Sequence, residues 1–70
     1  MSKYAIVIEK AKKNYSAYIP DVPGCIATGA TVEEVRTNLM QALVVHLELM
    51  REAGEAIPQP ITLTDFVEVA

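Results

Sequence analysis

The chain has 70 residues, of which 51% are hydrophobic, and its formal net charge at pH 7 is −3. A chain of this length forms a single domain, here residues 1–70, and buries only about 60% of its unfolded surface, so we expect the surplus apolar surface to be covered in an oligomer or by a partner. The negative charge argues against nucleic acid as a ligand, because binding to phosphates requires clustered Lys and Arg side chains.

Features that the sequence lacks indicate where in the cell the protein is found. Cys25 is the only cysteine, so an internal disulfide is impossible, as in most proteins of the reducing cytoplasm. The N-terminus has no long apolar segment followed by a cleavage site, which a signal peptide requires. No apolar run reaches the length of about 20 residues that spans a bilayer. We therefore expect a cytoplasmic protein that contacts no membrane.

Three strands joined by short turns are predicted in the first thirty residues. Residues 3–9 alternate, with Tyr4, Ile6 and Ile8 on one side, which is typical of a strand with one buried face. A charged loop leads into the second strand, which ends at Pro20 because proline cannot donate to a strand ladder. A Pro-Gly turn then leads into the third. The predicted strands are Lys3–Glu9, Tyr15–Ile19 and Cys25–Thr28.

A long helix follows the strands. Thr31 is a good N-cap residue, and Glu34, three positions later, completes a capping box. The helix is predicted over Val32–Ala53, with Gly54 as the residue that follows its C-terminal cap. Its apolar residues recur at helical spacing and define one stripe that faces the sheet. The stripe consists of Val32, Val35, Leu39, Leu43, His46, Leu47, Met50 and Ala53.

Several apolar side chains are left outside the predicted core. Met40 and Val44 lie beside the helical stripe, and Val7 lies on the sheet face that the helix does not cover. We predict that these three residues form an oligomer interface, in a dimer or a tetramer, because a small soluble domain rarely leaves such side chains uncovered.

The last part of the chain is predicted to return to the sheet. Pro58 and Pro60 disfavour helix and fix an extended connector. Phe66–Val69 then has the composition of a strand, within a segment that begins near Ile61. The element order is β-β-β-α-β, an α+β fold. A right-handed crossover would place the last strand beside the first, which gives the sheet order 3-2-1-4 with one helix on one face.

No catalytic constellation stands out. His46 has no ligand partner at metal-binding spacing, so we interpret it as a packing residue, and we interpret Cys25 as a small buried side chain. The Lys10, Lys12 and Lys13 cluster is interpreted as a solvated hairpin tip. The carboxylates that a two-metal nuclease site would require have simpler roles as caps and surface residues. They are Glu9, Asp21, Glu33, Glu34, Asp65 and Glu68. We expect neither a metal nor another cofactor.

The loop between the second and third strands is the most distinctive segment. Residues 20–24 read Pro-Asp-Val-Pro-Gly, which predicts a stiff, exposed turn. Such a loop fixes strand register, and its stiffness also lowers the ordering cost of binding a partner. We predict a partner-binding surface here. Its residues are Tyr18, Pro20, Asp21, Val22 and Pro23.

The order of these motifs resembles the HicB antitoxin family. In that family a strand runs into Pro-Asp-Leu-Pro-Gly-Cys, where this chain has Val22 in place of Leu, and then into a Gly-x-Thr-x-Glu-Glu helix start. The similarity extends from the Tyr4–Ile8 strand to the connector at residues 54–60. It implies a partial ribonuclease-H-like fold and a protein that masks a small basic toxin, HicA, which cleaves messenger RNA.

The resemblance also implies what to expect of DNA binding. HicB proteins usually add a C-terminal DNA-binding segment that recognises their own promoter. This chain ends at Ala70, directly after the predicted last strand, so we expect no such module and no direct DNA binding.

Three hypotheses about function follow. In the first, the chain is a non-enzymatic, oligomeric HicB-like antitoxin that occludes a HicA-like toxin ribonuclease. In the second, it is a metal-dependent nuclease on a ribonuclease-H-like sheet, with Glu9 and Asp21 as candidate ligands. In the third, it is an orphan module that oligomerises or binds a ligand.

Overall fold

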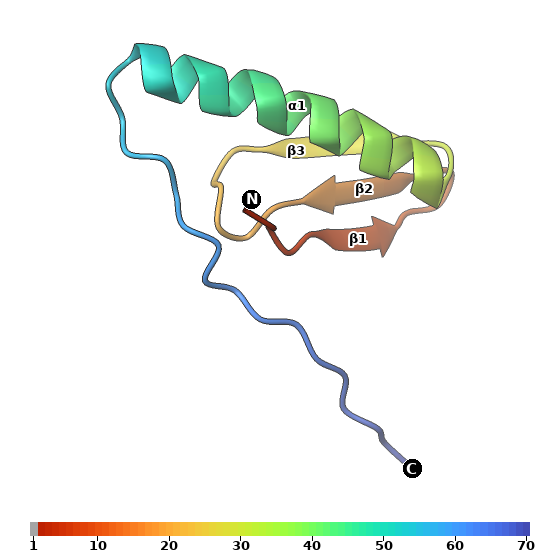
Figure 1. Ribbon diagram of the computed structural model, residues 1–70. Coiled ribbons are helices and arrows are strands. Elements are labelled where there is room, and N and C mark those ends of the chain that lie inside the picture. Colours follow the sequence, from red (N-terminus) through yellow and green to blue (C-terminus); the bar gives the residue numbers. More distant parts are fainter. Residues whose placement is uncertain (1) are drawn as a thin grey trace.

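The computed structural model describes residues 2–70, which form a three-stranded antiparallel sheet, a single helix laid on one face of it, and a long extended C-terminal segment (Figure 1). The sheet order is β1-β2-β3, so each strand lies next to its neighbour in sequence. The α+β class and the antiparallel meander are therefore confirmed. The elements are β1 (Val7–Lys10), β2 (Tyr15–Tyr18), β3 (Ile26–Gly29) and α1 (Val32–Glu52).

The strand register assigns the two faces of the sheet. Ile8 stands opposite Ala17, and Ala17 stands opposite Ala27, so these three small or branched side chains form one row across the sheet. Ala17 is buried against the helix, which makes this the core face. Because successive side chains on a strand point to opposite faces, residues one position along each strand lie on the open face.

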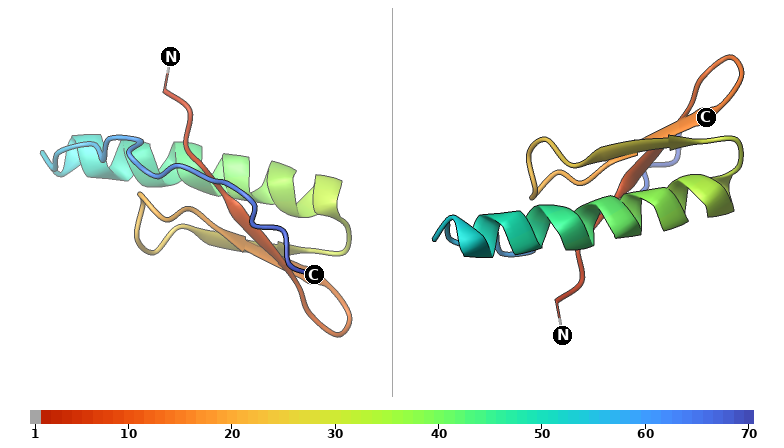
Figure 2. Two further views of the ribbon diagram at one scale, coloured as in Figure 1. Left: turned by 90° about the horizontal axis from the view of Figure 1, so that it is seen from below. Right: turned by 90° about the horizontal axis from the view of Figure 1, so that it is seen from above.

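The core is small and lies between the sheet and the first half of the helix. Val35 and Leu39 enter it from α1, and partly buried side chains from the first strand region and the helix close its edges. Figure 2 shows that the helix lies entirely on one side of the sheet. The buried residues are Ala17, Ile19, Val22, Cys25, Val35 and Leu39.

The helix begins and ends as its sequence predicts. The backbone N–H of Glu34 donates to the side-chain oxygen of Thr31 at 3.0 Å. The Glu34 carboxylate in turn accepts from the N–H of Ala30 at 3.2 Å, one residue earlier than in the usual capping box. At the other end, Gly54 takes φ +74° and its N–H donates to the carbonyl of Arg51. A glycine suits this left-handed position because it has no Cβ.

The helix sits over one side of the sheet and not over its centre. It packs on β3 and β2, and the side-chain amide of Asn38 donates to the carbonyl of Thr28 in β3 at 2.8 Å. Gly29 allows this close approach, because a Cβ there would stand 2.6 Å from the backbone nitrogen of Val35. As a result, the β1 side of the sheet is left less covered than the β3 side.

The predicted fourth strand does not form. Residues 53–70 contain no helix or strand, and Phe66–Val69 runs away from the sheet (Figure 1). Within residues 2–70 the sheet order is therefore 3-2-1 and not 3-2-1-4. The physical reason is that the backbone N–H groups of Ile61 and Thr62 donate to Asp21. This contact holds the connector beside the loop after β2 and directs the following residues away from β1.

The predicted first strand is also shorter than expected. Its ladder begins at Val7 and not at Lys3, because the pairing register with β2 starts where Val7 meets Tyr18. The residues before Val7 lie outside β1, yet Tyr4 and Ile6 still pack against the core. The alternating apolar residues before Val7 therefore pack against the core although they do not pair with β2.

Gly29 gives a test of the helix–sheet contact. We expect Gly29→Ala to lower the free energy of unfolding by about 1–3 kcal/mol, because the new Cβ would meet helix backbone that cannot move aside as a side chain can. Chemical denaturation with circular dichroism measures the change. Thr28→Ala, on the exposed neighbour, should change stability by less than about 0.5 kcal/mol. Equal stability of Gly29→Ala and the unchanged chain would contradict this description of the contact.

Candidate protein-binding interface

The loop between β2 and β3 is stiff. The N–H of Val22 donates to the carbonyl of Ile19 at 3.0 Å, and the N–H of Cys25 donates to the carbonyl of Val22 at 3.2 Å. A third backbone bond joins Ile19 and Cys25 across the base of the loop. Gly24, at φ +85°, supplies the backbone conformation that this turn requires. The loop thus has a defined shape before any partner arrives.

Only part of the predicted partner-binding surface faces outward. Pro20 and Pro23 are exposed at the rim of the loop, as expected. Val22 is only 1% exposed and belongs to the core, so its predicted role in partner binding is wrong. The Val22 side chain fills the loop from beneath, because every third residue here, Ile19, Val22 and Cys25, is buried and closes the end of the apolar core. Val22 therefore stiffens the rim without contributing to its surface.

Asp21 holds the C-terminal segment. One carboxylate oxygen accepts from the N–H groups of Ile61 and Thr62 at 3.1 and 3.0 Å, and the other accepts from the Thr62 hydroxyl at 2.7 Å. These bonds, led by the one from the Thr62 hydroxyl, hold the pKa of Asp21 below its ordinary value of 3.8. Asp21 therefore makes a contact within the chain, and its predicted contact with a partner stays a prediction.

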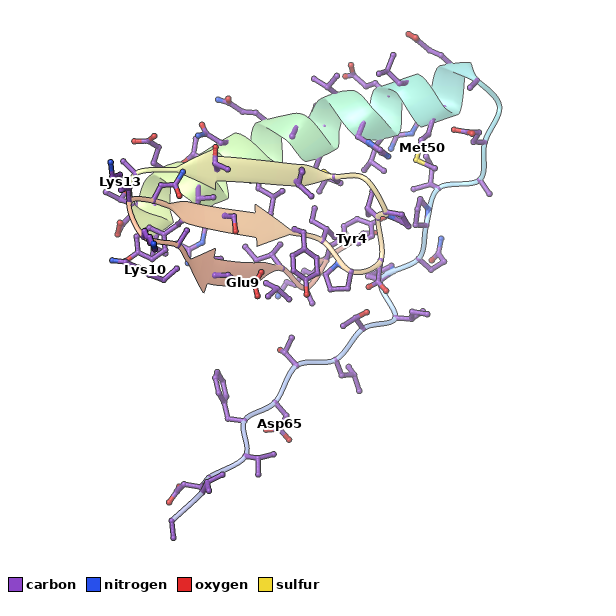
Figure 3. All side chains as sticks on the ribbon, turned by 180° about the vertical axis from the view of Figure 1, so that it is seen from behind. Tyr4, Glu9, Lys10, Lys13, Met50 and Asp65 are labelled. Carbon is purple, nitrogen blue, oxygen red and sulfur yellow. The ribbon has the colours of Figure 1, made fainter. Side chains whose placement is uncertain are left out.

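A second contact holds the connector shortly before Ile61 and Thr62. The hydroxyl of Tyr4 donates to the backbone carbonyl of Pro58. Tyr4 and Asp21 come from the two ends of the first hairpin region, so they tie the connector to the sheet at two points. The connector is consequently fixed as far as Thr62, and the residues after it project from the body, as Figure 3 shows around Asp65.

The open face of the sheet carries an apolar row. Val7 stands opposite Tyr18, and Tyr18 stands opposite Ile26, so the row crosses all three strands. Tyr18 is 40% exposed and Ile26 is 70% exposed. The next row on the same face is polar and consists of Glu9, Ser16 and Thr28. An apolar row with a polar border, beside a stiff loop, has the composition of a protein-binding surface.

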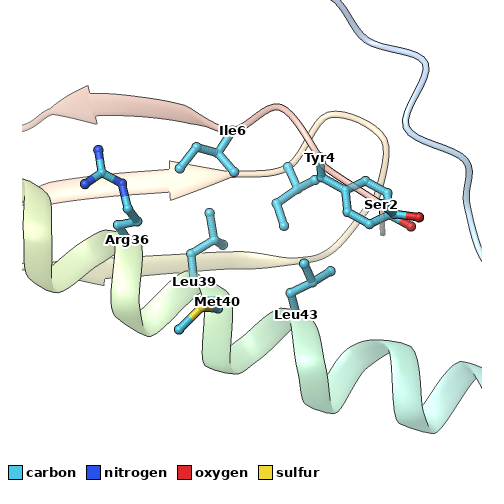
Figure 4. A pocket seen from close by; sticks show the side chains of 8 residues that line it. Ser2, Tyr4, Ile6, Arg36, Leu39, Met40 and Leu43 are labelled. Atoms are coloured by element: carbon cyan, nitrogen blue, oxygen red, sulfur yellow. The ribbon is translucent and has the colours of Figure 1, made fainter.

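A groove separates the segment that precedes β1 from the helix. It has a volume of about 180 Å³ and is mostly apolar, with Arg36 at one end (Figure 4). Figure 4 shows Ile6 and Tyr4 on the strand side and Leu39, Met40 and Leu43 on the helix side. The groove exists because the helix is displaced toward β3. Its lining residues are Ser2, Tyr4, Ile6, Ile19, Arg36, Leu39, Met40 and Leu43.

The three residues of the predicted oligomer interface do not share one surface. Met40 and Val44 are exposed on the helix, and Met40 lines the groove. Val7 lies on the opposite face of the sheet, in register with Tyr18. One flat interface with one partner copy therefore cannot contain all three residues. The structure instead offers two separate apolar surfaces, which are the open-face row and the groove.

The candidate catalytic side chains have packing or capping positions. His46 is half-buried on the sheet side of the helix, near Gly24. Cys25 is buried in the core, and burial raises the pKa of its thiol, which disfavours the nucleophilic thiolate. Among residues 2–70, no three His, Cys, Asp or Glu side chains gather so as to hold a metal ion.

Comparison with known proteins identifies the family. The family model for HicB-like antitoxins of bacterial toxin–antitoxin systems matches residues 4–69, which is nearly the whole chain. The chain belongs to this family. The solved structure of a HicA3 and HicB3 toxin–antitoxin complex contains a chain that matches with a TM-score of 0.71 and 33% identity. That match covers 81% of this chain and 66% of that one.

Two relatives are similar to this HicB-like chain over most of its length. A UPF0150 protein of Thermotoga maritima is 40% identical over 65 residues, which are 91% of this chain and 83% of that protein. An uncharacterized 14.9 kDa protein of Haemophilus phage HP1 is 36% identical over 64 residues, which are 91% of this chain. The present chain spans 48% of the phage protein.

In residues 2–70, no helix is both long and apolar enough to cross a membrane.

Sequence reasoning missed two parts of this HicB-like surface. Ile26 follows the predicted turn and was expected only as part of a short strand, although register makes it the most exposed member of the apolar row. Thr62 was not singled out either, because its role depends on a partner 41 residues away. Alternation within residues 26–29 was a usable signal for Ile26, whereas no local pattern indicates the Asp21–Thr62 contact.

The Asp21 contact predicts a pH dependence. Because the folded pKa lies below 3.8, the stabilising contribution of the carboxylate is fully present above 3.8 and is lost as the pH falls through the lower folded value. We expect the amide NMR resonances of Ile61 and Thr62 to shift together with a midpoint below 3.8. Asp21→Ala should abolish this titration, whereas Asp65→Ala, in the same segment, should leave it unchanged. A midpoint at or above 3.8 would contradict the assignment.

Proposed function

We propose that this HicB-like chain is an antitoxin that binds a small HicA-type toxin, an mRNA-cleaving ribonuclease, and masks its active site. The observation that carries the proposal is the apolar row of half-buried Val7 and exposed Tyr18 and Ile26 beside the stiff proline loop. The similarity to a chain from a HicA3 and HicB3 complex supports a toxin as the partner. Masking requires only a surface that covers the toxin, with no reaction by the antitoxin.

The physical properties of this surface suit a protein partner. Tyr18 offers a large ring with a polar hydroxyl, which is a side chain that often dominates binding energy at interfaces. The loop is already fixed by backbone hydrogen bonds, so little conformational entropy is lost when it is covered. The net charge of −3 would also steer the association with a basic toxin.

The proposal includes self-association and no catalysis. Exposed Met40 and Val44 add to the apolar surface that a homo-oligomer, a dimer or a tetramer, would cover. The acidic residues that a nuclease would need are used differently, since Asp21 holds the connector and Glu34 caps the helix. We propose that the chain acts in the cytoplasm, where its toxin would meet messenger RNA, and that it does not bind DNA directly.

Growth rescue tests the proposal. The chain is co-expressed with a HicA-like toxin encoded beside its gene, and colony formation and co-purification are measured. We expect the unchanged chain to restore growth. Ile26→Asp should weaken toxin binding at least tenfold, because it places a charge at the most exposed position of the apolar row. Failure of the unchanged chain either to bind the toxin or to restore growth would overturn the proposal.

A matched variant separates the sheet surface from general effects of added charge. Leu49→Asp introduces the same charge at a comparably exposed apolar position, on the helix and away from the open sheet face. We expect this variant to bind the toxin and restore growth like the unchanged chain. Equal loss of binding in both variants would show that the open sheet face is not the toxin-binding surface.

A further inference from the structure

The C-terminal segment exposes an unusual amount of apolar surface. Its five large apolar side chains have exposed fractions between 79% and 96%, although the backbone there is extended. Small soluble domains seldom leave so much contiguous apolar surface uncovered. The segment therefore has the properties of a strand that lacks a neighbour. The five residues are Ile61, Leu63, Phe66, Val67 and Val69.

The alternation of the segment indicates which side of it would be buried. In an extended chain, residues two apart share a face, so Leu63, Val67 and Val69 lie together with Asp65 among them. The opposite face carries Thr64 and Glu68 along with Phe66. One face is thus mostly apolar with a single carboxylate, which is typical of a strand that lies half-buried against a core.

The β1 edge of the sheet is a surface that such a strand fits. Among the described residues 2–70, β1 pairs only with β2, so the backbone groups along its other edge are available for a further strand. The apolar groove lies next to the start of this edge, between the residues that precede β1 and the helix (Figure 4). A strand added to β1 would lay its apolar face into the groove, and Asp65 would meet a surface that carries Arg36.

Charge favours the same placement. The segment after Thr62 contains two carboxylates, Asp65 and Glu68, and no basic residue. The β1 edge region contains Lys3, Lys10 and the groove residue Arg36, with Glu9 as its one acidic side chain. Opposite charges on the two surfaces orient the approach of the segment.

The segment cannot readily reach the β1 edge of its own chain. Ile61 and Thr62 are held by Asp21, and from there the chain diverges from β1 (Figure 1). Returning to β1 would require a sharp turn immediately after Thr62. Residues 61–64, where this turn would lie, contain no Gly, Pro, Asn, Asp or Ser, which are the residues that make such turns inexpensive. A second copy of the chain meets neither obstacle.

We propose that residues 63–69 of one copy add as a strand to the β1 edge of a second copy, with Leu63 and Val67 in the second copy's groove, and that the exchange is reciprocal. Each copy has one such segment and one β1 edge, so two copies pair both segments with both β1 edges and form a closed, symmetric dimer. This inference goes beyond the proposed function and does not depend on any toxin.

Paired variants test the exchange in the purified chain without toxin. We expect the unchanged chain to sediment at about twice its mass of 7.6 kDa. Leu63→Asp and Met40→Asp, one on each side of the contact, should each raise the dimer dissociation constant at least tenfold. Both side chains are substantially exposed in the single chain, so neither variant should disturb its fold, which circular dichroism verifies. Amide hydrogen exchange in β1 should become faster in both variants.

Matched controls add the same charge outside the contact. Thr64→Asp lies on the other face of the exchanged segment, and Val45→Asp lies on the β3 side of the helix, away from the groove. We expect both controls to remain dimeric, with dissociation constants within about twofold of the unchanged chain. A monomeric unchanged chain, or equal loss of dimer in the controls, would overturn the proposal.

Mixing the two variants distinguishes exchange between copies from docking within one chain. The Met40→Asp copy retains an intact segment, and the Leu63→Asp copy retains an intact groove, so one productive contact remains between them. We expect native mass spectrometry of the mixture to show a heterodimer that neither variant forms with itself. Absence of this heterodimer would overturn the exchange. The exchange would also be overturned if the unchanged chain were monomeric and Leu63→Asp abolished its binding to the toxin. That result would show that the segment contacts the toxin and not a second copy.

Discussion

The hydrogen bonds between the Asp21 carboxylate and residues 61 and 62 determine the shape of this molecule outside its small core. They join a loop near the start of the chain to a connector near its end, and the buried Val22 beneath the loop keeps the carboxylate in place. Because the contact holds the connector at that point, the chain beyond Thr62 is directed away from the sheet. The edge of β1 and the groove beside it therefore stay uncovered within one copy.

Much of the fold could be predicted from local patterns. Alternation predicted the three strands, and Thr31 with Glu34 predicted the helix start, because each of these signals depends on residues that are close in sequence. The last strand was predicted from the same kind of pattern but is unpaired. Its alternation describes a side chain arrangement suited to burial, and it carries no information about which edge, or which copy, provides the neighbour.

The candidate site was predictable only in part, for a similar reason. The proline loop was predictable because proline and glycine fix its backbone angles, and its rim at Pro20 and Pro23 is exposed as the sequence predicts. The inward turn of Val22 and the use of Asp21 inside the chain depend on contacts across up to 41 residues. The row of Val7, Tyr18 and Ile26 follows from strand register, which the sequence suggests for each strand singly but does not fix between strands.

The extended, unpaired backbone of residues 63–70 has a consequence for the lifetime of the protein. Proteases bind their substrates as extended strands and cut where the backbone is accessible, so a single copy presents a cleavage site that needs no prior unfolding. Covering that backbone would remove the site. The abundance of the protein would then depend on its own concentration, since dilute copies would be degraded faster than assembled ones.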